Sequence, residues 1–193
     1  MVQIQKLISL KKPGAVFTAR DFQAIADSPT IRQILRRLTE NGTIRRIARG
    51  VYDKPVFSTF LNEYEAADIY QTAKIIARSN NWTIAPSGNI ALNMLGLSTQ
   101  VSASWTFVSD GPYRKYTIGT STIEFKHRAN REITGISEKS LLIIQALKAL
   151  GKERITDNHL AKIQKQLTED EKTMLLLESR NASVWIVQAI KRI

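Results

Sequence analysis

The segment DSPTIRQILRRLTENG, residues 27–42, decides how the N-terminal part of this chain is expected to fold. Its apolar residues recur at the i, i+3, i+4, i+7 spacing that forms one buried stripe on an α-helix. They are Ile31, Ile34, Leu35 and Leu38. Ser28 is predicted as the N-cap, with Pro29 at the first helical position, where its missing N–H costs nothing. Asn41 and Gly42 favour a left-handed end. The segment therefore predicts one amphipathic helix.

Two helical patterns precede this segment. Apolar side chains recur along residues 2–10 at the spacing of an amphipathic helix, and Pro13 ends that pattern. The run VFTARDF, residues 16–22, opens a second, short helix. Thr18 is its predicted N-cap, and Asp21 at the third helical position makes a weak capping box.

A basic hairpin is predicted to follow, over the run TIRRIARGVY at residues 43–52. Ile44 and Ile47 cannot share one face of a regular strand, which predicts a bulge or a short strand. Helices followed by a basic hairpin are typical of a winged helix-turn-helix domain, which we expect over residues 1–57.

The net charge of +11 is unevenly distributed along the chain. Residues 1–60 hold 11 Lys and Arg against 4 Asp and Glu, a surplus of 7. Residues 61–193 hold 17 against 13, a surplus of 4. A local surplus favours a surface that binds a polyanion over a general effect on solubility. Nucleic acid is the first candidate partner, and an anionic membrane is the second.

The predicted helix and hairpin carry the candidate DNA-binding residues. A helix fits the width of the major groove, and side chains near its N-terminus then reach the edges of the bases. The residues expected nearest the bases are Ser28, Thr30, Arg32 and Gln33. Arg36 and Arg37, further along the helix, are expected to contact phosphate. Arg45, Arg46 and Arg49 are expected to form the wing, which lies along an adjacent groove or the backbone. The expected partner is double-stranded DNA.

A solvated basic face, or a face that docks an acidic protein, is the alternative interpretation of these arginines. Six of them fall within the 18 positions of residues 32–49, where Glu40 is the only acidic residue. That density favours contact with a duplex.

Residues 58–193 are expected to form a second, mixed α/β domain that is mostly helical over residues 136–193. The expected helices cover residues 61–79, 89–95, 141–150 and 184–193, with others starting at Thr156 and Thr168. The expected strands cover residues 82–85, 101–108 and 116–125. The fold class is therefore α+β.

Several features exclude function classes. The chain has no cysteine, which excludes disulfides and thiolate metal sites. Gln3, Gln5 and Lys6 interrupt any signal-peptide core, and no apolar run approaches a membrane span. We therefore expect a cytoplasmic protein without membrane contact. His127 and His159 lack neighbours of metal-ligand type, so no metal and no cofactor is expected.

Two further hypotheses come from the second domain. Asp110 followed by Glu124 and Lys126 matches the loose Asp…Glu-x-Lys pattern of metal-dependent nucleases, although Asp110 lies in an Asp-Gly-Pro turn that explains it structurally. The last helix presents an apolar face around Trp185. Core packing explains that face best, and a groove for a protein partner is the alternative.

The chain resembles the AbiEi family of antitoxins. The resemblance rests on VFTARDF at residues 16–22, the arginine helix, IRRIARGVY at residues 44–52, and later motifs such as APSG at residues 85–88 and SDGP at residues 109–112. It implies an autoregulating repressor of a type IV toxin–antitoxin operon that binds inverted repeats. It also implies opposition to a nucleotidyltransferase-type toxin without a stable complex. Larger family members have a longer C-terminal domain, so autoregulation carries over more directly than toxin neutralisation. We expect no enzymatic activity.

Overall fold

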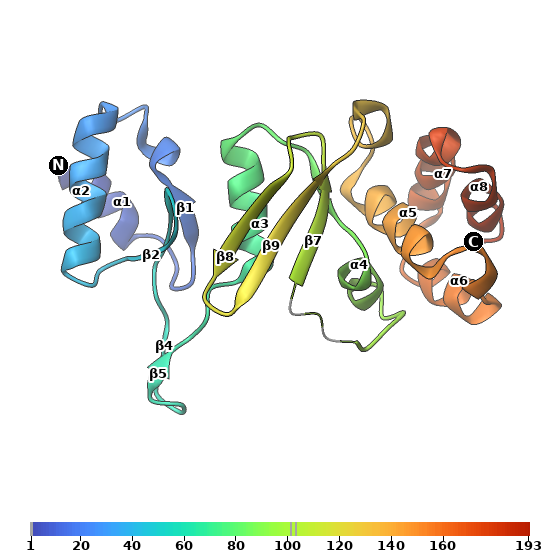
Figure 1. The fold of residues 1–193 in the computed structure, drawn as a ribbon, viewed down its shortest axis with the longest axis horizontal. Coiled ribbons are helices and arrows are strands. Elements are labelled where there is room, and N and C mark those ends of the chain that lie inside the picture. The colour runs from blue at the N-terminus through green and yellow to red at the C-terminus, as the bar shows by residue number, and fades with distance from the viewer. Residues whose placement is uncertain (1, 101, 103) are drawn as a thin grey trace. The chain divides into compact units, whose positions relative to one another are not determined.

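A computed structural model describes residues 2–100, 102 and 104–193, and within them the chain has a mixed α+β fold (Figure 1). The chain divides into two compact units. One contains residues 1–81 and 116–123, and the other contains residues 82–115 and 124–193. The domain boundary predicted after residue 57 stays a prediction.

The N-terminal part of the first unit is built from two helices and a small sheet. Its elements are α1 (Val2–Ser9), β1 (Val16–Thr18), a 3₁₀ turn (Ala19–Phe22), α2 (Ser28–Glu40), β2 (Arg45–Ala48) and β3 (Val51–Asp53). The three strands are antiparallel in the order β1-β3-β2. The predicted stripe of α2 is buried in one core with Ile4, Ile8, Phe17, Phe22 and Ile44. Hydrophobic burial therefore sets which face of α2 points outward.

The start of α2 differs from the prediction. The N-cap is Asp27, whose carboxylate accepts the N–H of Thr30 at 3.1 Å, and Ser28 is the first residue of the helix. The hydrogen bonds from Thr30 lower the pKa of Asp27 below its usual range. A carboxylate at a helix N-terminus also faces the positive end of the helix dipole, which a serine hydroxyl does not exploit.

The hairpin after α2 contains the predicted bulge. Gly42 lies at φ 75°, in the left-handed region, and turns the chain out of the helix. The register of β2 against β3 shifts between Arg46 and Ala48. Ile47 is therefore the extra residue of β2. Because of this bulge, the residues before and after Ile47 both stay paired with β3.

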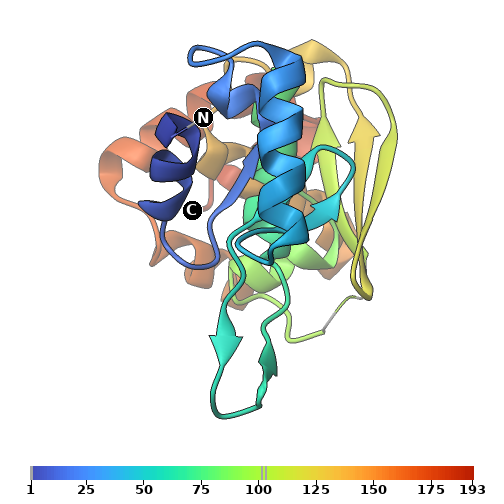
Figure 2. The same cartoon turned by 90° about the vertical axis from the view of Figure 1, so that its left-hand side faces the viewer.

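The helix predicted over residues 61–79 is wrong in its first half. The chain forms a two-stranded hairpin, β4 (Phe57–Ser58) and β5 (Glu63–Tyr64), and the helix α3 runs only over Ile69–Ser79. Asp68 caps α3 by accepting the N–H of Gln71 at 2.9 Å. Residues 60–66 are exposed, so no buried stripe exists there to hold a helix. Figures 1 and 2 both show this hairpin projecting away from α1 and α2.

The sheet that includes strands of the second unit has the order β6-β7-β9-β8. Its strands are β6 (Ile84–Pro86), β7 (Ser104–Ser109), β8 (Arg114–Ile118) and β9 (Ser121–His127), and α4 (Asn89–Met94) follows β6. The single strand predicted over residues 116–125 is therefore wrong. Gly119 lies at φ 57° and turns the chain into a β8–β9 hairpin. The strand predicted over residues 101–108 is observed at 104–109, and positions 101 and 103 lie outside the described residues.

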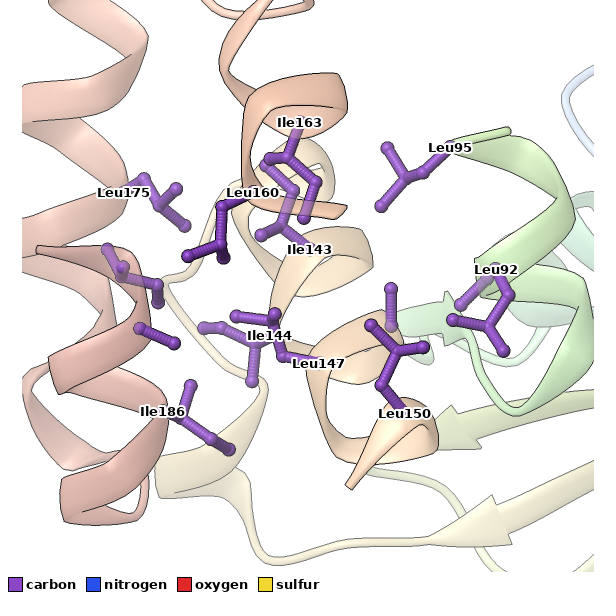
Figure 3. Packing of buried hydrophobic residues seen from close by; sticks show 14 residues of the cluster. Leu92, Leu95, Ile143, Ile144, Leu147, Leu150, Leu160, Ile163, Leu175 and Ile186 are labelled. Carbon is purple, nitrogen blue, oxygen red and sulfur yellow. The ribbon is translucent and has the colours of Figure 1, made fainter. Parts of the chain in front are cut away.

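Four helices complete the second unit. They are α5 (Glu138–Leu150), α6 (Asp157–Gln164), α7 (Glu169–Glu178) and α8 (Val184–Ile190). The predicted helix starts at Thr156 and Thr168 are confirmed, and Ser137 caps α5. Each of the three hydroxyls accepts a backbone N–H of the first turn. Figure 3 shows these helices and α4 packing around a shared core, which includes Leu92, Leu147 and Ile186. Within the described ranges, no helix has both the length and the apolar character needed to cross a membrane.

Candidate nucleic-acid interface

One flank of α2 carries a stripe of polar side chains next to the buried stripe. Arg32, Arg36 and Thr39 recur at i, i+4 and i+7, so they lie on the same side of the helix. Both arginines are exposed, whereas the neighbours Ile31 and Leu35 are buried. The core below α2 therefore determines the direction in which these guanidinium groups point.

The hairpin of β2 and β3 brings two more arginines to this flank. Arg46 pairs in register with Tyr52, and Arg49 lies in the turn before Gly50, which has φ 76°. The Tyr52 ring stacks on the buried Phe17 ring, with centroids 6.2 Å apart and an interplanar angle of 19°. Because Tyr52 is anchored in the core, its strand has a defined position beside α2.

These four arginines share one shallow hollow of about 510 Å³. We call it the arginine hollow. Its lining residues are Ala19, Arg32, Arg36, Thr39, Glu40, Arg46, Arg49, Gly50 and Tyr52. Four cationic side chains face one carboxylate there, which leaves a local charge of +3.

The one carboxylate of the hollow, Glu40, is paired with an arginine of the same helix. Arg36 Nε donates to Glu40 Oε1 at 2.7 Å, and both side chains are largely exposed. This hydrogen bond raises the pKa of Arg36 above its already high usual value, so the group stays cationic at every physiological pH. An exposed pair of this kind contributes little to stability and can rearrange around a bound anion.

Other residues predicted for the interface lie outside the arginine hollow. Gln33 and Arg37 are exposed on α2, on the stripe next to Arg32 and Arg36. Ser28 is exposed too, four residues before Arg32 on the same stripe, but it does not line the hollow. Thr30 is half-buried, and Asp27 accepts its N–H.

Arg45 does not join the arginine hollow. Its guanidinium forms a two-pronged contact with the Asp53 carboxylate, with Nε to Oδ1 at 3.1 Å and Nη2 to Oδ2 at 2.6 Å. Nη2 also donates to the Glu65 carbonyl at 3.0 Å. The hydrogen bond to Asp53 raises the pKa of Arg45. Adjacent residues of a strand point to opposite faces, which separates Arg45 from Arg46.

Five lining residues of the hollow were not among the predicted site residues: Ala19, Thr39, Glu40, Gly50 and Tyr52. For Thr39 a signal was present, because it continues the i, i+4, i+7 stripe of Arg32 and Arg36. Tyr52 and Ala19 reach the hollow only through the pairing of the sheet, which helical spacing does not encode.

Two residues of the nuclease hypothesis have structural partners, and the third, Lys126, lines one shallow hollow with Glu124. Asp110 Oδ1 accepts the N–H of Thr83 at 2.9 Å, which caps the turn after β7. Glu124 forms an ion pair with Lys115, with Oε1 and Nζ 3.4 Å apart. Among the described residues, no group of three His, Cys, Asp or Glu side chains is arranged to hold a metal ion.

Comparison with known families assigns the chain to one of them. It belongs to the family described as "Family of unknown function (DUF6088)", whose profile matches residues 3–175. A search of curated proteins finds no match to the chain.

Proposed function

We propose that this member of the DUF6088 family is a sequence-specific DNA-binding repressor, with residues 1–57 acting as a winged helix-turn-helix domain. The observation that carries the proposal is the arginine hollow. Two arginines of α2 and two of the β2–β3 hairpin converge on one exposed surface from positions up to 17 residues apart. Phosphate is the ligand whose charge and spacing suit such a cluster.

The two parts of the surface would perform different tasks. The helix α2 has 13 residues, so it is about 20 Å long. With its side chains a helix is about 10–12 Å across, which matches a major groove about 12 Å wide. Its outermost side chains, including Gln33 and Arg37, would then face the base edges. The arginine hollow, on the flank toward the hairpin, would hold the phosphates that border the groove.

The biological context of the repressor is a second proposal, and it rests on the resemblance to AbiEi-family antitoxins alone. On that basis the operator is an inverted repeat in the protein's own promoter. The repressor would oppose a nucleotidyltransferase-type toxin encoded alongside, without forming a stable complex with it. The adjacent reading frame tests this context directly, since a product without nucleotidyltransferase motifs would contradict it.

DNA binding is tested by fluorescence anisotropy with a duplex from the upstream region, over a series of salt concentrations. If four arginines contact phosphate, raising salt from 50 to 200 mM should weaken binding about a hundredfold. Binding to a scrambled duplex of equal length should be weaker at every salt concentration. No binding at the lowest salt would refute the proposal.

A pair of double variants connects the affinity to the hollow. The change Arg46→Ala with Arg49→Ala should reduce the slope of log affinity against log salt by about 2. Lys165→Ala with Lys191→Ala is the matched control, because it removes the same charge from exposed positions of the second unit. Equal losses in both variants would indicate a response to net charge rather than to the arginine hollow.

A further inference from the structure

The hairpin of β4 and β5 exposes a large apolar surface for so short a segment. We call residues 57–64, with the sequence FSTFLNEY, the aromatic arm. The exposed fractions are 48% for Phe57, 94% for Phe60, 59% for Leu61 and 60% for Tyr64. Single exposed apolar residues are common on protein surfaces, but four within eight positions mark a contact site.

The aromatic arm is held in a defined shape. The rings of Phe57 and Tyr64 meet edge-on across the hairpin, with centroids 5.3 Å apart. The Leu61 N–H donates to Ser58 Oγ at 3.3 Å, and the Glu65 N–H donates to the Val56 carbonyl at 2.8 Å. These contacts preorganise the apolar side chains, which lowers the entropy cost of binding.

Arg45 fixes the base of the aromatic arm. Its guanidinium joins the carboxylate of Asp53, at the end of β3, to the carbonyl of Glu65, just after β5. Arg45, which lies outside the arginine hollow, therefore connects the arm to the β1-β3-β2 sheet.

The strands of the aromatic arm have open edges. In the part of the chain that the structure describes, β4 pairs only with β5. A two-stranded hairpin is marginally stable in water, and an unpaired strand edge is a template for pairing with another strand. The arm therefore lacks both a covering layer and a neighbouring strand.

The charge of the arm region argues against DNA as its partner. Residues 55–73 contain no Lys and no Arg, while Glu63, Glu65 and Asp68 are acidic. In a chain of net charge +11, this stretch carries −3. These carboxylates would repel phosphates, and the cation at the base of the arm, Arg45, is already paired with Asp53.

We propose that the aromatic arm pairs with the aromatic arm of a second copy of this chain about a two-fold axis. With all four exposed residues of both arms covered, the pair would bury up to about 1,000 Å², which is the lower limit for a specific interface. A two-fold arrangement satisfies an apolar face and an open edge on both copies at once. This inference does not depend on DNA binding.

The mode of pairing predicts a sign for the effect of salt. Glu63 on each arm, with Glu65 and Asp68 just beyond it, repels its counterparts while the apolar side chains attract, so salt should leave the dimer unchanged or tighten it. An arm bound in the arginine hollow of a second copy would show the opposite sign, because that contact would join opposite charges. DNA binding also weakens with salt, so the two associations respond differently.

Analytical ultracentrifugation of the full chain, without DNA, tests the proposal. The wild type should form a concentration-dependent dimer at micromolar levels. Phe60→Ser with Leu61→Ser should raise the dissociation constant more than a hundredfold, because both copies lose both side chains. Leu61→Glu should act in the same direction by adding repulsion, and circular dichroism should show unchanged secondary structure in both variants.

The matched control is Leu10→Ser with Val184→Ser. These residues are 72% and 74% exposed, so the control removes comparable apolar surface away from the arm, and the dimer should persist. Three results would overturn the proposal: a wild type that stays monomeric, a dimer that tolerates the arm variants, and a dimer that salt or Arg46→Ala with Arg49→Ala dissociates. Since no DNA is present, a negative result for operator binding leaves this outcome unaffected.

Discussion

Replacing Arg45 or its neighbour Arg46 by alanine should produce opposite phenotypes, although both changes remove one arginine from the same strand. The Arg45 guanidinium holds the Asp53 carboxylate through two hydrogen bonds, and the Asp53 side chain is only 2% exposed. The Arg46 side chain is exposed in the arginine hollow. One arginine therefore supports the fold, and the other is available to a ligand.

The magnitudes follow from burial. Removing one partner of a buried ion pair costs about 3–5 kcal/mol, because the remaining charge is left without compensation. The Arg45 side chain is 35% exposed, so water already screens part of the contact, and we expect Arg45→Ala to cost about 2–4 kcal/mol. Arg46→Ala should change the free energy of unfolding by less than about 0.5 kcal/mol.

Urea denaturation at neutral pH, followed by circular dichroism, measures the free energy of unfolding of each variant. Anisotropy with the upstream duplex measures its affinity for DNA. Arg46→Ala should weaken DNA binding about tenfold. Arg45→Ala should change DNA affinity little at temperatures where the variant stays folded. The double variant Arg45→Ala with Asp53→Asn should recover part of the lost stability, since no buried charge remains unpaired.

Two results would refute this reasoning. A cost below about 1 kcal/mol for Arg45→Ala would show that Asp53 does not depend on its partner. Equal losses of DNA affinity for both variants would show that the two faces of β2 are not functionally distinct.

Three further predictions follow from the second unit. Gly111→Ala should destabilise the unit by about 1–3 kcal/mol in thermal denaturation, because an added Cβ would overlap the Trp82 ring, and Trp82→Ala in the same background should relieve part of this cost. Hydrogen bonds from Lys139 lower the pKa of Glu171 below its usual 4.5. The stability from that contact is present above pH 4.5 and is lost as pH falls through the lowered value, so Glu171→Gln should reduce the acid sensitivity of unfolding below pH 4.5. Incubation with plasmid and Mg²⁺ or Mn²⁺ should give no cleavage, whereas cleavage that disappears in Glu124→Gln would revive the nuclease hypothesis.

The sequence anticipated those parts of the fold that depend on neighbouring residues. The stripe Ile31, Ile34, Leu35 and Leu38 is buried in the structure as its spacing indicates. The bulge beside Ile47 and the helix starts at Thr156 and Thr168 were also anticipated. Each of these features depends on contacts within a few positions, which periodicity and capping chemistry encode directly.

Two predictions were wrong where the sequence shows apolar residues but not the surface against which they would pack. The helix predicted over residues 61–79 begins too early: residues 61–66 are exposed, and the rings of Phe57 and Tyr64 meet across a hairpin there. Gly119 was a turn signal inside a stretch of strand composition, and it divides that stretch into two strands. Local propensity is a weak guide when tertiary packing decides between helix and hairpin.

The order of residues by itself determined a basic N-terminal third, an amphipathic helix with arginines on its outer side, and the absence of cysteine chemistry. Which arginines act together was decided only when the chain folded. Asp53 and the carbonyl of Glu65 lie 8 and 20 residues beyond Arg45, and the return of the strand places both against its guanidinium. Arg46, one residue along, points to the other face and meets two arginines of α2. Net charge is a property of the list of residues, whereas a binding surface depends on which side of each strand and helix those residues occupy.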